Sequence, residues 1–291
     1  MKARIFSKAR VLGLSFLFIV VCALQGQDSQ SNDKQPTEQK TVSPAGDAEA
    51  LRKAAQNPVA SLISVPIQEN WNFGIQPGDR VQNVLNIQPV VPVDLAKSWN
   101  LIVRWITPVV WQPVPTQKNI GVYGLGDMVP TFFLSPAKPG ALIWGIGPAF
   151  QLPTATNFDT GQGKFGVGPS VVLLTQPGHW TIGVLANNVW SVGGPQGRPR
   201  INQFLMQYFI NYNLEKGWYL TTSPIVTADW RASQGNEWVA PVGGGVGRVC
   251  RLGPMPANIS VQFFGNAARP AGSSPWGMRL QMAFLFPRKP K

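Results

Sequence analysis

Apolar and polar residues alternate along most of this chain. From Val59 to Phe286 the alternation has a period of two, which places successive side chains on opposite faces of a β-strand. The clearest case is the last segment, where Met278, Leu280, Met282, Phe284 and Phe286 share one face and Arg279, Gln281 and Ala283 share the other. The run from Gln203 to Leu214 has the same character, with aromatic and aliphatic residues opposite amides. The pattern predicts an all-β protein.

Twelve strands account for this region. We expect them near residues 59–67, 81–91, 99–111, 120–134, 141–152, 164–174, 180–190, 202–213, 218–230, 237–250, 257–266 and 276–286. Most are close to the roughly 9 to 11 residues that cross a membrane as a tilted strand. Their connections mostly alternate between long and short, and the first, 68–80, belongs to the long class. This alternation is typical of an up-and-down antiparallel transmembrane β-barrel with short periplasmic turns and longer external loops.

Tryptophans mark the ends of several expected strands. Pairs ten to twelve residues apart bracket single strands and share the outward phase, at a spacing close to the ~25 Å apolar band of an outer-membrane barrel. We interpret seven tryptophans as aromatic girdles at the two membrane surfaces: Trp99, Trp111, Trp180, Trp190, Trp218, Trp230 and Trp276. The alternative is a set of ordinary core tryptophans in a soluble β-protein, which should show no preference for strand ends.

Prolines oppose this interpretation. Proline removes a hydrogen bond from a strand ladder, so it is uncommon inside strands. Bulges or bends would accommodate these residues, and the strand boundaries are least secure where they occur. Seven of them lie inside the expected strands: Pro89, Pro108, Pro130, Pro148, Pro169, Pro224 and Pro241.

The N-terminal region has a different character. Four basic residues precede an apolar run from Val11 to Leu24, which at 14 residues is shorter than the ~20 of a membrane-spanning helix. We therefore expect a signal peptide over residues 1–26, with cleavage after Ala23 or Gly26. The less favoured alternative is a lipoprotein site at Cys22.

Between the leader and the first strand, residues 27–56 are interpreted as a disordered linker that ends in a short helix over 47–56. That helix is either a periplasmic lead-in or a plug that enters the barrel. Residues 57–287 form the expected barrel, and 288–291 are a basic tail.

Composition supports a lipid environment. Charged residues make up 13% of the chain, against about 25% in ordinary soluble proteins. Of the 25 Lys and Arg residues, four lie in the leader, and the remaining 21 outnumber the 13 Asp and Glu residues. Because these cations are scattered singly through turns, we expect lipid headgroups and lipopolysaccharide as their partners rather than nucleic acid.

Several segments also resemble a known family. The chain is similar over about residues 55–287 to a bacterial family of outer-membrane transporters grouped with proteins named for the meta-cleavage pathway of phenol degradation. The resemblance implies an outer-membrane β-barrel in a Gram-negative bacterium, with transport by association, and it transfers no site residues. It rests on NPVASLISVPIQENWNFG (57–74), RVQNVLNIQPVVP (80–92), PTFFLSPAKPG (130–140), GPAFQLPTAT (147–156), NNVWSVGG (187–194), GWYLTTSPIVTADW (217–230), VGGGVGR (242–248) and the ending LQMAFLFP.

Enzymatic chemistry finds little support. His179 is the only histidine of the chain, and leader cleavage would leave Cys250 as the only cysteine, so we expect no metal site and no cofactor. The glycine-rich stretches GLGDMVP and GGGVG lack the signature of a phosphate-binding loop. A hydrolase would have to use His179, which lies in a turn beside Trp180, and no GxSxG motif is present.

The inward phase of the strands provides the candidate site. Arg104 and Asp127 lie on consecutive expected strands and are candidates for an ion pair. Twelve strands are too few for a wide porin, so a narrow polar pore follows. The residues expected to line the lumen are Gln88, Arg104, Asp127, Gln151, Asn187, Gln203, Gln207, Asn211, Thr221, Thr227, Asp229, Gln262, Arg279 and Gln281.

Three functions remain open at this point. The leading hypothesis is a narrow channel for small solutes, where a preference for hydrophobic or aromatic ones comes from the family resemblance alone. The second is a structural or adhesive barrel that transports nothing, and the third is an outer-membrane hydrolase. The last strand, Trp276 to Phe286, has the aromatic ends and alternation of a strand recognised by the outer-membrane insertion machinery.

Overall fold

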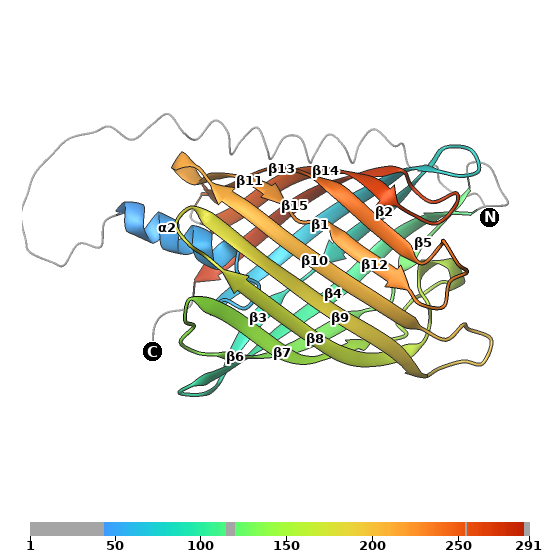
Figure 1. Cartoon of the computed structure of the whole chain (residues 1–291), viewed down its shortest axis with the longest axis horizontal. Helices are drawn as coiled ribbons and strands as arrows, with labels where there is room; N and C mark the ends of the chain where they lie inside the picture. Colours follow the sequence, from blue (N-terminus) through green and yellow to red (C-terminus); the bar gives the residue numbers. More distant parts are fainter. Residues whose placement is uncertain (1–43, 115–119, 254, 288–291) are drawn as a thin grey trace, which may run out of the picture.

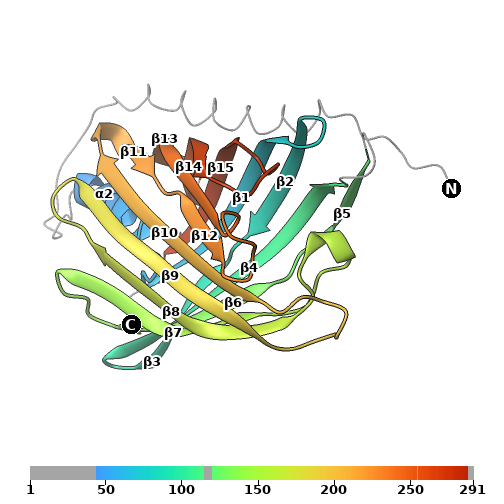
Figure 2. The same ribbon diagram turned by 45° about the vertical axis from the view of Figure 1, so that its right-hand side comes forward.

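A single antiparallel sheet closes on itself to form a barrel (Figures 1 and 2). The computed structural model describes residues 44–114, 120–253 and 255–287. The expected signal peptide, the linker before residue 44 and the basic tail lie outside them. Closure comes from the antiparallel pairing of the last strand with the first, from Leu62 opposite Pro287 to Phe73 opposite Trp276. This pairing leaves no open edge, as a sheet in lipid requires.

The barrel has twelve crossings, three of which consist of two shorter strands. Each crossing pairs with the next one along the chain, so the topology is up-and-down. The divided crossings are β2 with β3, β5 with β6, and β11 with β12. The strands are β1 (Leu62–Ile75), β2 (Arg80–Ile87), β3 (Val90–Ala96), β4 (Trp99–Pro113), β5 (Gly121–Leu125), β6 (Val129–Pro136), β7 (Leu142–Gln151), β8 (Phe165–Thr175), β9 (Trp180–Gly193), β10 (Asn202–Asn213), β11 (Trp218–Thr222), β12 (Ile225–Asp229), β13 (Trp238–Leu252), β14 (Met255–Ala268) and β15 (Trp276–Pro287).

The twelve-stranded antiparallel barrel predicted from the sequence is confirmed, but the expected first loop is wrong. Strand β1 runs to Ile75, well beyond the expected end at residue 67. The polar residues Gln68, Asn70 and Asn72 face inward, where the Nδ2 of Asn70 donates to the carbonyl of Val84 at 3.0 Å. Only residues 76–79 connect β1 to β2. A polar inner face had been mistaken for a loop.

Two of the seven prolines occupy breaks in the strands. Pro89 lies between β2 and β3, and Pro224 lies between β11 and β12, so the missing N–H groups cost no ladder hydrogen bond there. Pro241 adjoins a register shift in the pairing of β13 with β14. Pro148 and Pro169 lie opposite each other on β7 and β8. The breaks explain part of the proline pattern that the sequence left unexplained.

Glycines bring neighbouring backbones close together in the barrel wall. A Cβ atom at Gly147 would lie 1.8 Å from the carbonyl oxygen of Phe132, and one at Gly245 would lie equally close to that of Val261. Both glycines face the lumen. The glycine-rich run of β13 therefore has a packing role, because a side chain at Gly245 would collide with the backbone of the neighbouring strand.

Within residues 44–114, 120–253 and 255–287, helical structure is confined to short segments. Helix α2 (Pro44–Ala55) precedes the barrel, and two 3-10 turns, η1 (Phe158–Thr160) and η2 (Glu215–Gly217), lie in connections. In the described ranges, none of these helices has the length and hydrophobicity needed to span a bilayer. Figure 1 shows α2 at the barrel end where the short turns lie. By the loop-length rule this is the periplasmic end.

Candidate functional site: the barrel lumen

A cavity of about 170 Å³ lies inside the periplasmic half of the barrel. Its wall consists of inward-facing residues from β1, β3, β4, β9, β10, β11, β14 and β15. Gln88 and Ser223 contribute from the breaks between β2 and β3 and between β11 and β12. Its floor is the end of helix α2 and the residues after it, Ala54 to Pro58. The lumen is thus neither a packed core nor a continuous open pore at this level.

Helix α2 is held in the mouth of the barrel by apolar contacts on one side. Leu51, Ala54 and Ala55 pack against a buried cluster that includes Leu62 of β1 and Leu285 of β15. These two barrel residues lie on paired strands and face inward at the periplasmic end. The small alanines let the helix approach the wall closely.

Three hydrogen bonds hold the other side of the helix. The Nε2 of Gln56 donates to the Oδ1 of Asn213 at 2.9 Å, and both side chains are buried. A guanidinium nitrogen of Arg52 donates to the carbonyl of Leu214 at 3.0 Å, and the Nε2 of Gln176 donates to the carbonyl of Lys53 at 2.9 Å. The helix therefore contacts the β8–β9 and β10–β11 turns as well as the wall formed by β1 and β15. The end of the helix lies in the mouth of the barrel, at the floor of the cavity.

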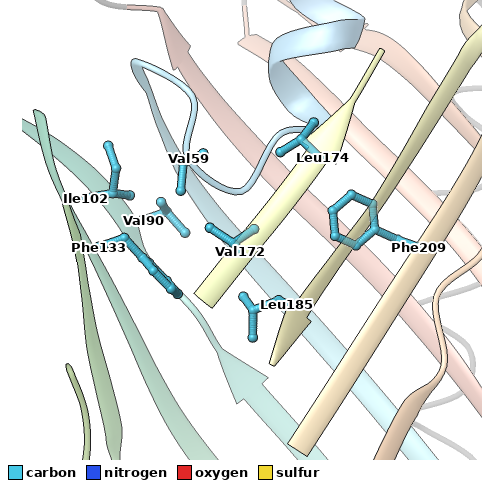
Figure 3. Packing of buried hydrophobic residues seen from close by; sticks show 8 residues of the cluster. All are labelled: Val59, Val90, Ile102, Phe133, Val172, Leu174, Leu185 and Phe209. Atoms are coloured by element: carbon cyan, nitrogen blue, oxygen red, sulfur yellow. The ribbon is translucent and has the colours of Figure 1, made fainter. Parts of the chain in front are cut away.

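The chain leaves α2 and inserts Val59 into an apolar cluster inside the lumen. Figure 3 shows Val59 pointing toward Val90, Ile102 and Phe133, which come from strands far from it in sequence. Ile102 and Phe133 are fully buried, and Val59 is 5% exposed. The remaining members are Val172, Leu174, Leu185 and Phe209. This cluster fills one side of the lumen and leaves the polar cavity on the other.

A belt of polar contacts crosses the middle of the barrel. Arg279 of β15 donates from Nε to the Oδ1 of Asn70 at 3.0 Å and from Nη1 to the carbonyl of Ser223 at 2.7 Å. Gln262 of β14 accepts from both the N–H and the hydroxyl of Ser223, at 3.0 and 2.9 Å. Ser223 belongs to the break between β11 and β12, so the interrupted strand supplies the backbone groups that the belt uses. Ser223 and Gln262 also line the cavity, so the belt forms part of its boundary.

Arg104 is the one charged residue in the cavity lining. Its Nη2 donates to the Oε1 of Gln88 at 2.8 Å. Neither Arg104 nor Arg279 forms an ion pair within the part of the chain that the structure describes, where the pair recorded is Lys53 with Glu49 on α2. The charges of these two arginines are therefore not balanced by an ion pair with any described residue.

The ion pair considered for Arg104 and Asp127 does not form, because Asp127 binds an external loop instead. Asp127 lies between β5 and β6, and its carboxylate accepts from the N–H groups of Ala155, Gln162 and Gly163 at 3.1, 2.6 and 2.8 Å. The Nε2 of Gln151 donates to it as well, at 3.2 Å. These bonds fold residues 152–164 over the end of the barrel. Because several backbone donors satisfy the carboxylate, it needs no cation.

The other residues selected from the sequence occupy several levels of the barrel. Four of them share the inner face of β9, β10 and β12: Asn187, Gln203, Thr227 and Asp229. Leu205 of β10 lies opposite both Asn187 and Thr227. Gln203 lies opposite both Val189 and Asp229. The carboxylate of Asp229 accepts from the N–H of Arg231 in the following loop. Those that line the cavity are Gln88, Arg104, Gln207, Asn211, Thr221, Gln262 and Gln281.

Several cavity residues were not selected from the sequence. Gln68 was assigned to a loop, and Tyr219 was not selected. The hydroxyl of Tyr219 donates to the Oδ1 of Asn258 at 2.6 Å within the lining. Asn258 and Ser260 alternate with apolar residues, so the period-two pattern contained the signal for them.

The tryptophans interpreted as girdles lie on the outer surface at strand ends. Trp99, Trp180 and Trp276 begin β4, β9 and β15, and Trp230 directly follows β12. Six of the seven have exposed fractions of 37% to 46%, as expected of side chains on an outer wall, whereas Trp218 at the start of β11 is half-buried. Trp238, which was not selected, contacts Trp230 edge to face at 5.3 Å between ring centroids.

The described residues do not bring together the side chains that hydrolysis or metal binding would need. The ring of His179 lies 6.0 Å from that of Tyr212, and within the described ranges its imidazole forms no hydrogen bond to a serine or a carboxylate. Those ranges also hold no cluster of three His, Cys, Asp or Glu residues that could bind a metal ion.

Comparison with solved structures identifies the type of barrel. The chain is similar to an outer-membrane channel from Pseudomonas putida F1, with a TM-score of 0.59 and 13% identity over 78% of this chain and 96% of that one. Weaker matches are the NanC porin (TM-score 0.45, 11% identity, 76% and 98% covered) and outer-membrane phospholipase A from Escherichia coli (0.42, 11%, 78% and 98%). No family model and no curated protein matches the sequence. The fold is that of a Gram-negative outer-membrane barrel, whose outer wall lies in a lipid bilayer.

Proposed function

We propose that this protein is an outer-membrane channel for small solutes whose periplasmic mouth is closed by its own helix α2. The observation that carries the proposal is the polar cavity inside the barrel. A barrel with only a structural role could fill its interior with side chains, as barrels of about eight strands do. Here amides, hydroxyls and one arginine surround unfilled space that ends at a separate helix.

The way α2 is held fits a removable closure. Its contacts with the barrel are a small apolar patch and three hydrogen bonds, each of which has a net stabilising effect of about 1 kcal/mol. The barrel wall itself is stabilised by a continuous ladder that does not include α2. The helix can therefore leave the mouth while the barrel remains folded.

We extend the proposal to the domain organisation, the family and the partners. Residues 1–26 are the signal peptide, 27–56 form a linker ending in the plug, 57–287 form the barrel and 288–291 form a basic tail. The protein belongs with the transporters associated with phenol degradation. Strand β15 is recognised by the insertion machinery, and exposed arginines of the external loops, such as Arg200 and Arg269, contact lipopolysaccharide.

We also propose that the chain is not an enzyme. The support is the position of His179 on a periplasmic turn, where its side chain contacts an aromatic ring rather than a nucleophile. The girdle tryptophans and the inner-face residues described above act in membrane anchoring and lumen lining. None of them is assigned a catalytic role.

Planar bilayers provide the test. Purified protein should give discrete conductance steps with a preference for anions, because the lumen arginines are uncompensated. Arg279→Ala should enlarge the steps, since it removes the contacts with Ser223 and Asn70 that narrow the lumen. Arg231→Ala, an exposed loop arginine, is the control and should leave the steps unchanged. Protein that conducts nothing, and still conducts nothing when α2 is destabilised, would favour a structural or adhesive barrel instead.

A further inference from the structure

The cavity above α2 has the features of a ligand site as well as those of a passage. Among all the residues that line it, Arg104 carries the only charge. Arg104 lies in the middle of β4, opposite Val90 on one side and Thr131 on the other, so its side chain points inward. A guanidinium has five N–H donors, and the contact with Gln88 uses one of them.

Arg104 lines the cavity, and the described residues accept no other hydrogen bond from its guanidinium. Gln88 is neutral, so the charge of Arg104 is not balanced by the protein groups that the structure describes around it. Arg279 provides a contrast within the same lumen. Its nitrogens reach Asn70 and Ser223, and its guanidinium lies over the ring of Phe264 at 5.0 Å. Arg279 thus supports the belt, whereas Arg104 has donors available for a ligand.

A buried guanidinium without a counter-charge is unfavourable unless an anion joins it. A carboxylate fits best, because its two oxygens match two parallel N–H donors of arginine. With one cation in the lining, one negative charge completes the balance. Amides such as Gln207 and Gln281 can bind further oxygen atoms of the ligand.

The wall next to Arg104 is apolar. Val90, Leu185 and Phe209 line the cavity and belong to the buried cluster in Figure 3. A simple inorganic ion would leave this surface in contact with water, whereas an organic acid would cover it. The volume of about 170 Å³ corresponds to roughly a dozen water molecules, which is room for a molecule of about ten non-hydrogen atoms.

We propose that this cavity binds a small organic monocarboxylate, with the carboxylate on Arg104 and the apolar part against Val90, Leu185 and Phe209. The inference deepens the proposed function, since it names the class of solute that the channel would pass. Binding is nevertheless measurable without transport. The two proposals can therefore fail separately.

The test is calorimetric titration of the purified, detergent-solubilised protein with benzoate, and with benzamide as its neutral analogue of the same shape. Benzoate should bind more tightly than benzamide. Arg104→Gln should weaken benzoate binding roughly 10- to 100-fold and leave benzamide unchanged, because only the charged hydrogen bonds are lost. Arg104→Lys, which keeps the charge but loses the paired donors, should give an intermediate value.

Arg231→Gln provides the control, since it removes the same charge from an exposed loop. Each variant should first show the faster gel migration of a folded barrel before boiling. The titrations should be repeated in a Val59→Ala background, in which we expect the mouth to open more often without a new charge beside the site, so that a closed entrance does not hide it. Equal binding of benzoate and benzamide, unchanged benzoate binding by Arg104→Gln, or no benzoate binding in either background would overturn the proposal. Benzoate binding by a protein that conducts nothing would refute the channel and retain the site.

Discussion

Substitutions of Val59 test whether α2 and the segment after it close the periplasmic mouth of the barrel. Val59 is 5% exposed and packs among Val90, Ile102 and Phe133. Val59→Ala removes two methyl groups from this cluster, at about 0.8 kcal/mol each, so the closed state should lose about 1.6 kcal/mol. Because every 1.4 kcal/mol is a tenfold change, the open fraction should rise roughly 15-fold. Val59→Asp should shift the equilibrium much further, since a charge in this cluster costs several kcal/mol.

Two assays should report the same change. In planar bilayers, the open probability should increase from the native protein to Val59→Ala and again to Val59→Asp. In detergent, trypsin should cut more rapidly after Arg52 and Lys53, because a helix released from the mouth unfolds locally and becomes accessible. Gel mobility before boiling should remain that of a folded barrel in every variant.

Val91→Ala is the matched control. It makes the same chemical change one residue after Val90, at a position on the outer face that is 37% exposed. It should leave both the open probability and the cleavage unchanged. If Val59→Asp also changed neither quantity in a folded barrel, α2 and the segment after it would not close the lumen, and the gating part of the proposed function would be refuted.

Two further predictions concern the wall and the external loop. Phe284→Asp replaces an outward-facing aromatic residue of β15 by a charge on the lipid side and loses about 2 kcal/mol of apolar burial. It should reduce the amount of heat-modifiable protein in the outer membrane. The inward change Gln281→Asn should not reduce it. Equal amounts of the two variants would show that the assigned faces of β15 are wrong. Asp127→Asn weakens the bonds to Ala155, Gln162 and Gly163, so chymotrypsin should cut after the exposed Phe158 about tenfold faster. An unchanged cleavage rate would mean that Asp127 does not hold this loop.

The architecture of the barrel could be predicted because it depends on local pattern. A strand exposes alternate residues to lipid and lumen, so each crossing carries its own signature, as in β10, where the expected range 202–213 is the observed one. Strand number and the outward phase of residues such as Met278 and Leu280 follow from this pattern alone. The misplaced first loop shows its limit. The outward-facing Glu69 accepts a hydrogen bond from Asn83 of β2, so β1 is polar on both faces there and lacks the usual alternation.

Tertiary structure decided what lies inside the barrel. Gln56 meets Asn213 and Arg52 meets Leu214 across more than 150 residues of sequence, and no local pattern reports such contacts. For the same reason the sequence could select Arg104 and Asp127 as inward-facing residues but could not identify their partners, Gln88 and the 152–164 loop. Whether a side chain fills the lumen, lines a cavity or holds a loop depends on which strands face each other across the closed barrel. Alternation sets the face on which a residue lies, and only closure of the sheet sets what that residue meets.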